Sequence, residues 1–330
     1  MSSTNSKKMT YVRLGSSGLK VSRLILGLAS YGNKSMEEWI LGEEEGIEHI
    51  KAAYDAGIQT FDTANVYSHG ESERILGKAI KELRLPRDEI VVMTKVYHVV
   101  KRSSESGIVF PGPDADAAGY VNQYGLSRKH IFDSIKHSLE RLQLDYVDVL
   151  QCHRFDYDTP ITETMQALHD VVKAGYARYI GMSSCHAYQF HAMQNYAISN
   201  NLTPFISMQN LYNLIYREEE REMMPTLKMF GVASELKRAC SSVAWTKKAK
   251  EDNKEIILRL EKIAKNRGIS MAQTAIAWEL SKNDVVAPII GVTSLERLKD
   301  TIGALDVKLT TEEIQQLEEP YVAQAIQGYT

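Results

Sequence analysis

The sequence predicts an α/β fold in which parallel β-strands alternate with helices along almost all of its 330 residues. Strand-length runs recur, and several are apolar at nearly every position, as expected of strands covered on both faces in a parallel sheet. Amphipathic helical segments separate these runs, and repeated strand–helix units form parallel sheets with right-handed crossovers. Parallel barrels commonly reach this length as one unit, so we expect residues 1–330 to form a single domain.

The expected elements begin with an antiparallel hairpin. After a disordered tail of residues 1–9, Tyr11–Leu14 pairs with Lys20–Ser22 across the turn Gly15-Ser16-Ser17-Gly18. Seven further strands are expected, in chain order, at Leu24–Leu28, Gln59–Asp62, Ile90–Thr94, Tyr146–Gln151, Tyr179–Ser183, Phe205–Gln209 and Val286–Ile290.

Two helices between these strands have clear apolar stripes. Glu71–Leu83 places Ile75, Ala79 and Leu83 on one face. Ser127–Leu142 repeats the pattern, with Ser127 placed as its N-cap.

Two segments depart from this rhythm. Ser103–Gly125 is rich in Gly, Pro, Ser and Asp and is too long for an ordinary βα loop. We expect this long loop to lie over the carboxyl-terminal end of the sheet. Residues 231–253 stand where another strand is due, yet they contain no convincing apolar run.

The composition is that of a globular protein with no nucleic-acid or membrane partner. Lys and Arg number 39 against 42 Asp and Glu, which argues against nucleic-acid or polybasic membrane binding. The three cysteines are an odd number without CxxC spacing, so neither a disulfide framework nor a zinc knuckle is indicated. No apolar stretch suits a signal peptide or a membrane span, and we expect a cytoplasmic location.

Polar residues stand at the ends of the predicted strands. In a closed parallel barrel such positions meet at the carboxyl-terminal rim, where barrel active sites lie. Each residue alone could be a helix cap or a solvated strand end, but the whole set indicates a site. The nine histidines show no HExxH or other ligand spacing, so no metal is expected. The strand-end residues are Asp62, Lys95, His153, Ser183, Ser184, Gln209, Asn210 and the run from Gly291 to Ser294.

Three of these residues, with Tyr67 from the loop after Asp62, suit proton transfer. A tyrosine is a poor acid at neutral pH, but a neighbouring Lys95 ammonium favours the phenolate and lowers the tyrosine pKa. Asp62 can hold that lysine in place, and a His153 N–H can orient a carbonyl oxygen. Such a group suits protonation of an alkoxide formed by hydride addition.

The residues around this group form recognisable motifs. The run from Asp62 to Glu73, DTANVYSHGESE, resembles the signature of the aldo-keto reductase superfamily. Further motifs follow in order, and details of two segments resemble fungal aryl-alcohol dehydrogenase-like members. The further motifs are Met93–Lys95, Cys152–Arg154, Gly181–Ser184 and Ile290–Arg297, and the two segments are His153–Asp156 and Tyr212–Glu218.

The resemblance implies a (β/α)8 TIM barrel with a hairpin across its bottom and NADP(H)-dependent reduction of small-molecule aldehydes or ketones to alcohols. Tyr67 would be the general acid, Lys95 and Asp62 would tune it, and His153 would direct the substrate carbonyl. The oligomeric state is not implied.

The resemblance also implies a cofactor site. Ser183 and Gln209 would hold the nicotinamide carboxamide, with Ser184 where many members have Asn. A segment for the adenine and the 2′-phosphate would contain Gly291, Thr293, Ser294, Arg297 and Asp300. Arg297 favours NADP, because a guanidinium pairs well with a phosphate. The GxGxxG fingerprint of Rossmann folds is absent from the sequence.

One departure concerns the seventh strand–helix unit. The family has a strand there that ends in a stacking aromatic residue and a Ser-Pro-Leu loop along the pyrophosphate, but residues 231–253 contain no Ser-Pro. The sequence favours a truncation that leaves the barrel wall open and weakens cofactor binding. The other interpretation is a degenerate strand at Val243–Thr246 with Trp245 as the stacking residue.

Three functions follow from these observations. The first is an active NADPH-dependent reductase of aromatic or other apolar aldehydes. The second is a non-catalytic, cofactor-sensing binding protein on the same barrel, and the third is an impaired remnant. The intact Asp62, Tyr67, Lys95 and His153 favour the first, whereas the atypical segment favours the others.

Overall fold

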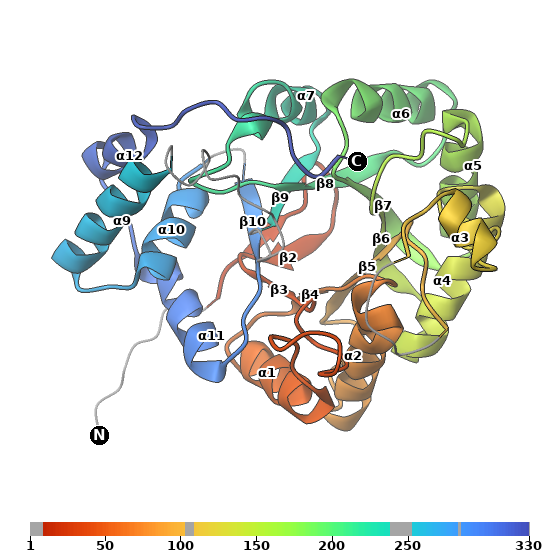
Figure 1. The fold of residues 1–330 in the computed structure, drawn as a ribbon, viewed down its shortest axis with the longest axis horizontal. Coiled ribbons are helices and arrows are strands. Elements are labelled where there is room, and N and C mark those ends of the chain that lie inside the picture. Colours follow the sequence, from red (N-terminus) through yellow and green to blue (C-terminus); the bar gives the residue numbers. More distant parts are fainter. Residues whose placement is uncertain (1–8, 103–108, 238–252, 283–284, 330) are drawn as a thin grey trace.

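A closed barrel of eight parallel strands forms the centre of the computed structural model, which describes residues 9–102, 109–237, 253–282 and 285–329 (Figure 1). Around the barrel the strands follow one another in the order β10-β3-β4-β5-β6-β7-β8-β9. Their bounds are β3 Ile25–Gly27, β4 Thr60–Asp62, β5 Val91–Val96, β6 Val147–Cys152, β7 Ala177–Ser183, β8 Phe205–Leu211, β9 Ala233–Lys237 and β10 Val285–Ile290.

Helices cover the outside of the barrel. The longer ones are α1 Glu43–Asp55, α2 Glu71–Glu82, α4 Arg128–Leu142, α5 Ile161–Lys173, α6 Ala187–Ser199, α9 Lys254–Arg267 and α10 Met271–Leu280. Shorter ones are α3 Pro113–Ala117, α7 Met223–Phe230, α11 Leu295–Ile302 and α12 Thr311–Glu318, with the 3-10 turns η1 Tyr67–Gly70, η2 Glu218–Glu220 and η3 Gly303–Asp306. No helix among these described residues is long and apolar enough to cross a membrane.

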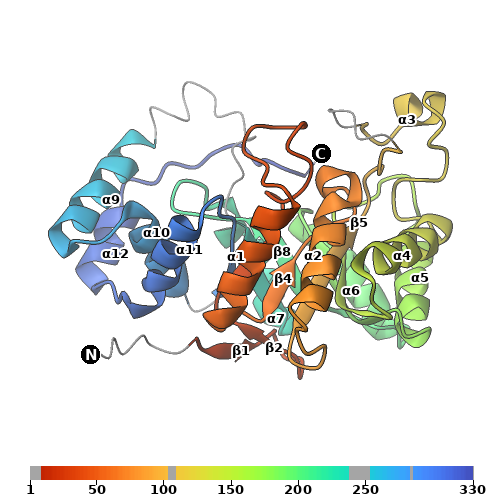
Figure 2. The ribbon, with the colours of Figure 1, turned by 90° about the horizontal axis from the view of Figure 1, so that it is seen from below.

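A hairpin of β1 (Tyr11–Arg13) and β2 (Lys20–Ser22) lies at the end of the barrel opposite α3 and the C-terminus (Figure 2). The turn of this hairpin contacts the barrel wall just before β9, where the Ser16 amide donates to the Gly231 carbonyl at 2.8 Å. Gly15 is required there, because its φ is +60° and a Cβ would stand 2.7 Å from that same carbonyl oxygen.

The two largest apolar clusters of the described residues lie inside the barrel and between its strands and helices. Alternate residues of β5 show the division, since Val91 and Met93 pack inside with Leu14 of the hairpin turn, whereas Val92 packs outward. The next inward position of β5 is Lys95. The barrel interior is therefore apolar near the hairpin and polar toward the carboxyl ends of the strands.

The expectation of an open barrel wall at the seventh unit is wrong. Ala233–Lys237 forms β9, which pairs in parallel with β8 on one side and with β10 on the other, so the wall is closed. The strand lacks an apolar run because Glu235 points into the polar layer of the interior, where an apolar residue is not needed. The alternative strand at Val243–Thr246 lies outside the described residues.

The other expected strands and both helices are confirmed with shifts of one or two residues at their ends. Ser127 caps α4 as predicted, since its side chain accepts a hydrogen bond from the His130 amide at 3.2 Å. Met9, placed in the expected tail, is instead buried in the core. The rest of that tail, residues 1–8, lies outside the described residues.

Candidate active site

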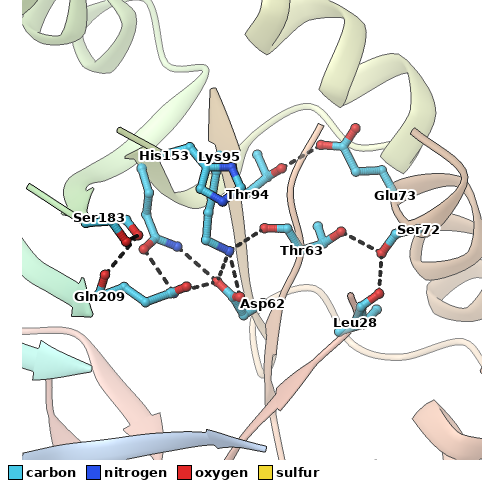
Figure 3. Close-up of polar contacts among 12 residues, drawn as sticks. Leu28, Asp62, Thr63, Ser72, Glu73, Thr94, Lys95, His153, Ser183 and Gln209 are labelled. Atoms are coloured by element: carbon cyan, nitrogen blue, oxygen red, sulfur yellow. Dashed lines mark hydrogen bonds and ion pairs between the residues drawn. The ribbon is translucent and has the colours of Figure 1, made fainter. Parts of the chain in front are cut away.

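An ion pair between neighbouring strands forms the centre of the polar layer (Figure 3). Lys95 Nζ on β5 lies 2.6 and 2.8 Å from the two carboxylate oxygens of Asp62 on β4, and it donates a third bond to the Thr63 carbonyl at 2.8 Å. The lysine side chain is fully buried and the aspartate side chain is 2% exposed. The ammonium group is therefore surrounded by acceptors, as a buried charge requires.

Tyr67 lies beside this pair. Lys95 Nζ is 5.1 Å from the centre of the tyrosine ring. Burial lowers the pKa of Lys95, but the negative charge of Asp62, the Tyr67 side chain and hydrogen bonds to both raise it, so this pKa stays above its ordinary value. The lysine is thus a stable cation next to the phenol.

His153 follows β6 and completes the group of four predicted from the sequence. Its ring lies edge-on to Tyr67, with ring centres 5.8 Å apart and planes at 84°. On another side it contacts the ring of His98 at 4.9 Å, and its backbone amide donates to the Val96 carbonyl at 2.9 Å. The structure therefore brings Asp62, Tyr67, Lys95 and His153 to one end of the barrel.

The residues after Asp62 fix this arrangement to the surrounding elements. Thr63 Oγ1 lies 2.8 Å from the Ser72 hydroxyl, which donates to the Leu28 carbonyl. Buried Glu73 accepts from Thr94 of β5 and pairs with Arg141 of α4 at 2.6 Å. The polar residues of the DTANVYSHGESE run thus anchor the start of α2 against two neighbouring units.

Two glutamines share the Asp62 carboxylate. The side-chain amides of Gln151 on β6 and Gln209 on β8 each donate to Asp62 Oδ1 at 3.0 Å. The Gln209 amide also lies 3.2 Å from Gln151 Oε1. Gln209, predicted for the cofactor site, is therefore part of the same hydrogen-bond network as the Asp62–Lys95 pair.

Ser183 and Ser184 lie next to Gln209 at the end of β7. The Ser183 hydroxyl donates to the Gln209 carbonyl at 2.8 Å, and the Ser184 amide donates to that carbonyl at 3.1 Å. Ser184 has a φ of +46°, in the left-handed region that Asn adopts more readily than most residues. The Asn that the family resemblance implies at this position would suit this backbone geometry.

The remaining predicted cofactor residues stand after β10, at the start of α11. Ser294 is the N-cap of that helix, and the exposed Arg297 guanidinium donates to the Thr293 hydroxyl at 2.8 Å. Asp300 is half-buried and accepts from Ser270 at 2.6 Å, so it links α10 to α11. A Cβ at Gly291 would meet nothing within 4 Å, which leaves space at the strand end.

These two groups of residues fit a dinucleotide. The Ser183 hydroxyl oxygen keeps lone pairs for a carboxamide N–H, while a helix start with an exposed arginine suits a phosphate. Within the described ranges, no three His, Cys, Asp or Glu side chains are grouped to hold a metal ion. Trp245, the candidate stacking residue, lies outside the described residues.

The long loop after β5 packs partly on itself. Tyr120 is buried with Val99 and Ala115, and the Tyr124 hydroxyl donates to Asp116 at 3.0 Å. Phe110, by contrast, is 70% exposed. The part of the expected loop at residues 103–108 lies outside the described residues.

Three residues near the reacting group, Gln151, Arg154 and Glu235, were not predicted from the sequence. Gln151 ends a predicted strand, but a glutamine there has no distinctive chemistry, and Arg154 adjoins the predicted His153. Burial lowers the pKa of Arg154, and Tyr67 and Tyr97 oppose that shift, which places its charge near Tyr67. Glu235 gave no signal because its strand was not predicted.

Comparisons with known proteins agree with the geometry. The model of the Aldo/keto reductase family matches residues 23–321. The chain is 45% identical to a versiconal hemiacetal acetate reductase of Aspergillus parasiticus, covering 96% of this chain and 98% of the relative. It is 44% identical to an aldo-keto reductase of Metarhizium robertsii, with coverage of 99% and 95%. A Schizosaccharomyces pombe protein assigned by name to the aryl-alcohol dehydrogenases is 45% identical, with coverage of 96% and 97%.

Proposed function

The chain belongs to the aldo/keto reductase family, and from that premise we propose that it is an NADPH-dependent reductase of aromatic and other apolar aldehydes or ketones. Membership in the family makes it a nicotinamide-dependent oxidoreductase of carbonyl compounds. The observation that carries the finer proposal is the buried Asp62–Lys95 pair beside Tyr67 and His153.

The four residues divide the proton chemistry between them. His153 directs the substrate carbonyl oxygen toward Tyr67, and the tyrosine hydroxyl donates its proton to the alkoxide oxygen that forms there. The Lys95 cation then stabilises the phenolate that remains, and Asp62 keeps the ammonium in position. Nicotinamide, when bound, supplies the hydride that reaches the carbonyl carbon.

Ser183, Ser184 and Gln209 would hold the carboxamide end of the cofactor, and Gly291, Thr293, Ser294, Arg297 and Asp300 the adenine end. Arg297 supports NADPH over NADH, because its exposed guanidinium at the start of α11 can pair with a 2′-phosphate.

An aromatic or other apolar substrate is supported by two observations. Relatives with similar sequences are named for aryl alcohols and for versiconal hemiacetal acetate. The centre of the His98 ring lies 4.9 Å from that of His153, and the centre of the Tyr97 ring lies 5.1 Å from that of His98. Flat apolar molecules suit aromatic surroundings of this kind.

The test is NADPH oxidation by the purified protein against a panel of aromatic and aliphatic aldehydes, with the alcohol product identified. We expect turnover, with aromatic aldehydes preferred. Tight NADPH binding without an alcohol product from any aldehyde would instead favour the non-catalytic binding protein.

A further inference from the structure

One buried polar residue of the barrel interior, Glu235, has no part in the proton transfer described above. Glu235 stands on β9 in register with Gln209 of β8 and Ala287 of β10, and it is fully buried. The Gln209 and Ser207 side chains both approach its carboxyl group. Even so, neither Glu235 oxygen makes a well-formed hydrogen bond.

The groups around Glu235 contain too few donors for a carboxylate. Gln209 Oε1 and Ser207 Oγ are also buried without a partner. The Gln209 amide nitrogen is already directed at Asp62 and Gln151, so the oxygen of this amide is the atom left without a partner, and it can only accept. An ionised Glu235 would add two more acceptors, and the Ser207 hydroxyl is the one remaining donor among these three side chains.

One proton on Glu235 supplies the donor that this group lacks. A neutral carboxylic acid can donate its O–H to Gln209 Oε1, which has no other partner. Without that proton, the side-chain oxygens of Glu235 and Gln209 would all be acceptors in a buried site, where an unsatisfied polar group is costly.

The charges around Glu235 also favour the neutral form. Burial and the negative charge of Asp62 raise its pKa, whereas Lys95, Gln209 and Ser207 lower it, and the balance is a pKa of about 8. The charged groups that act on Glu235 are Asp62 on β4 and Lys95 on β5. Its neighbour in register on β10, Ala287, carries no charge. Since Lys95 is already engaged by Asp62, a second carboxylate beside the pair has no free cation among these residues.

We propose that Glu235 is a neutral carboxylic acid that positions Gln209 by donating a hydrogen bond to its side-chain oxygen. This inference rests on the proposed function, because Gln209 is assigned there to the nicotinamide. Glu235 is a positioning residue, since it acts through Gln209 and not on the reacting atoms. Loss of its proton at high pH turns the Gln209 side chain away from its place, and cofactor binding weakens.

Infrared spectroscopy of the cofactor-free protein tests the protonation state without requiring activity. At pH 7 we expect a carboxylic-acid C=O band that is absent from Glu235→Gln and disappears from the unaltered protein as pH passes about 8. In Gln209→Leu the band should move to higher frequency, because the donated hydrogen bond is lost. The proposal is overturned if Glu235→Gln shows every acid band of the unaltered protein. It is also overturned if the band keeps its frequency in Gln209→Leu.

NADPH titrations then test the positioning. Glu235→Gln keeps an N–H donor for Gln209 and should keep the affinity at every pH. Glu235→Leu should bind roughly three- to tenfold more weakly, as expected for one hydrogen bond. The unaltered protein should lose a similar factor between pH 7 and 9, and the glutamine variant should not.

A matched control is Glu219→Gln, which removes another buried carboxyl group with a pKa raised to about 7 by burial. It should leave the pH 8 transition in place. Should Glu235→Leu fail to fold, the comparison of Glu235→Gln with the unaltered protein across pH still decides the matter. Equal pH dependence in those two proteins contradicts the proposal. If no form binds NADPH, the proposed function fails, while the infrared bands still decide the state of Glu235.

Discussion

Tyr67 carries the transferred proton in the proposed reaction, and Tyr67→Phe removes its hydroxyl group alone. Because a positioned general acid contributes about 10²- to 10⁴-fold, we expect kcat to fall by that factor. NADPH affinity should stay within about twofold, since Tyr67 is not among the residues assigned to the cofactor. Steady-state rates and a fluorescence titration measure both, and a variant that keeps most of its kcat removes Tyr67 from the mechanism.

Arg297 should decide between NADPH and NADH. Removing one charge-assisted contact to a phosphate costs about 1.5–3 kcal/mol, so Arg297→Ala should bind NADPH roughly ten- to a hundredfold more weakly. NADH affinity should hardly change. Lys299→Ala, which removes an exposed cation from the same helix, serves as the control and should affect neither. Equal affinity of the unaltered protein for both cofactors contradicts the assignment.

At the scale of residues, the sequence predicted those side chains that follow apolar strands. Asp62, Lys95 and His153 were found because the carboxyl ends of parallel strands meet at one rim. Gln151 was missed because a glutamine at a strand end has no distinctive chemistry. Its place in the site follows only from the hydrogen bond that its side-chain amide donates to Asp62.

At the scale of elements, β9 shows where pattern reasoning failed. A search for an apolar run assumes that both faces of a strand pack on apolar side chains. Near the carboxyl ends of this barrel the inner face packs on Asp62, Lys95 and Gln209 instead, so ASELK can form a strand with Glu235 inward. The pairing with β8 and β10 that fixes this strand is a property of the closed sheet and not of the five residues.

The start of α2 should prove important for stability. Glu73→Gln leaves Arg141 near a neutral partner in a site where the glutamate is fully buried and the arginine is 10% exposed. Removing one partner of a buried ion pair costs about 3–5 kcal/mol in the free energy of unfolding. Glu71→Gln breaks the exposed pair with Arg74 on the same helix and should cost less than about 1 kcal/mol. Urea unfolding of both variants checks this, and equal losses would contradict the anchoring role.

At the scale of the whole molecule, closure of the barrel around Glu235 makes stability depend on pH. The pKa of this group is raised to about 8 in the folded protein, so the folded state holds a proton that the unfolded chain releases near pH 4.5. The stabilisation is complete below pH 4.5 and is lost as pH rises through 8.

Relative to Glu235→Gln, the unaltered protein should therefore lose about 1.4 kcal/mol of unfolding free energy per pH unit across this interval. Urea unfolding at pH 5, 7 and 9 measures the difference between the two proteins. A difference that does not change with pH would mean that Glu235 has an ordinary pKa in the folded state.

Closure of the wall also bears on the choice between an enzyme and an impaired remnant. The expectation of an open wall rested on a missing seventh strand, and that strand is present. Residues 231–253 nevertheless contain no Ser-Pro pair, and a fluorescence titration with NADPH measures the effect on cofactor affinity.

In the proposed reaction this barrel transfers hydride from NADPH to a carbonyl carbon. Isotope transfer shows this step when the protein is incubated with an aromatic aldehyde and NADPH that carries two deuterium atoms at nicotinamide C4. We expect an alcohol with one deuterium on its carbinol carbon, formed at a far lower rate by Tyr67→Phe. Binding of NADPH without labelled alcohol from any aldehyde of the panel would contradict it.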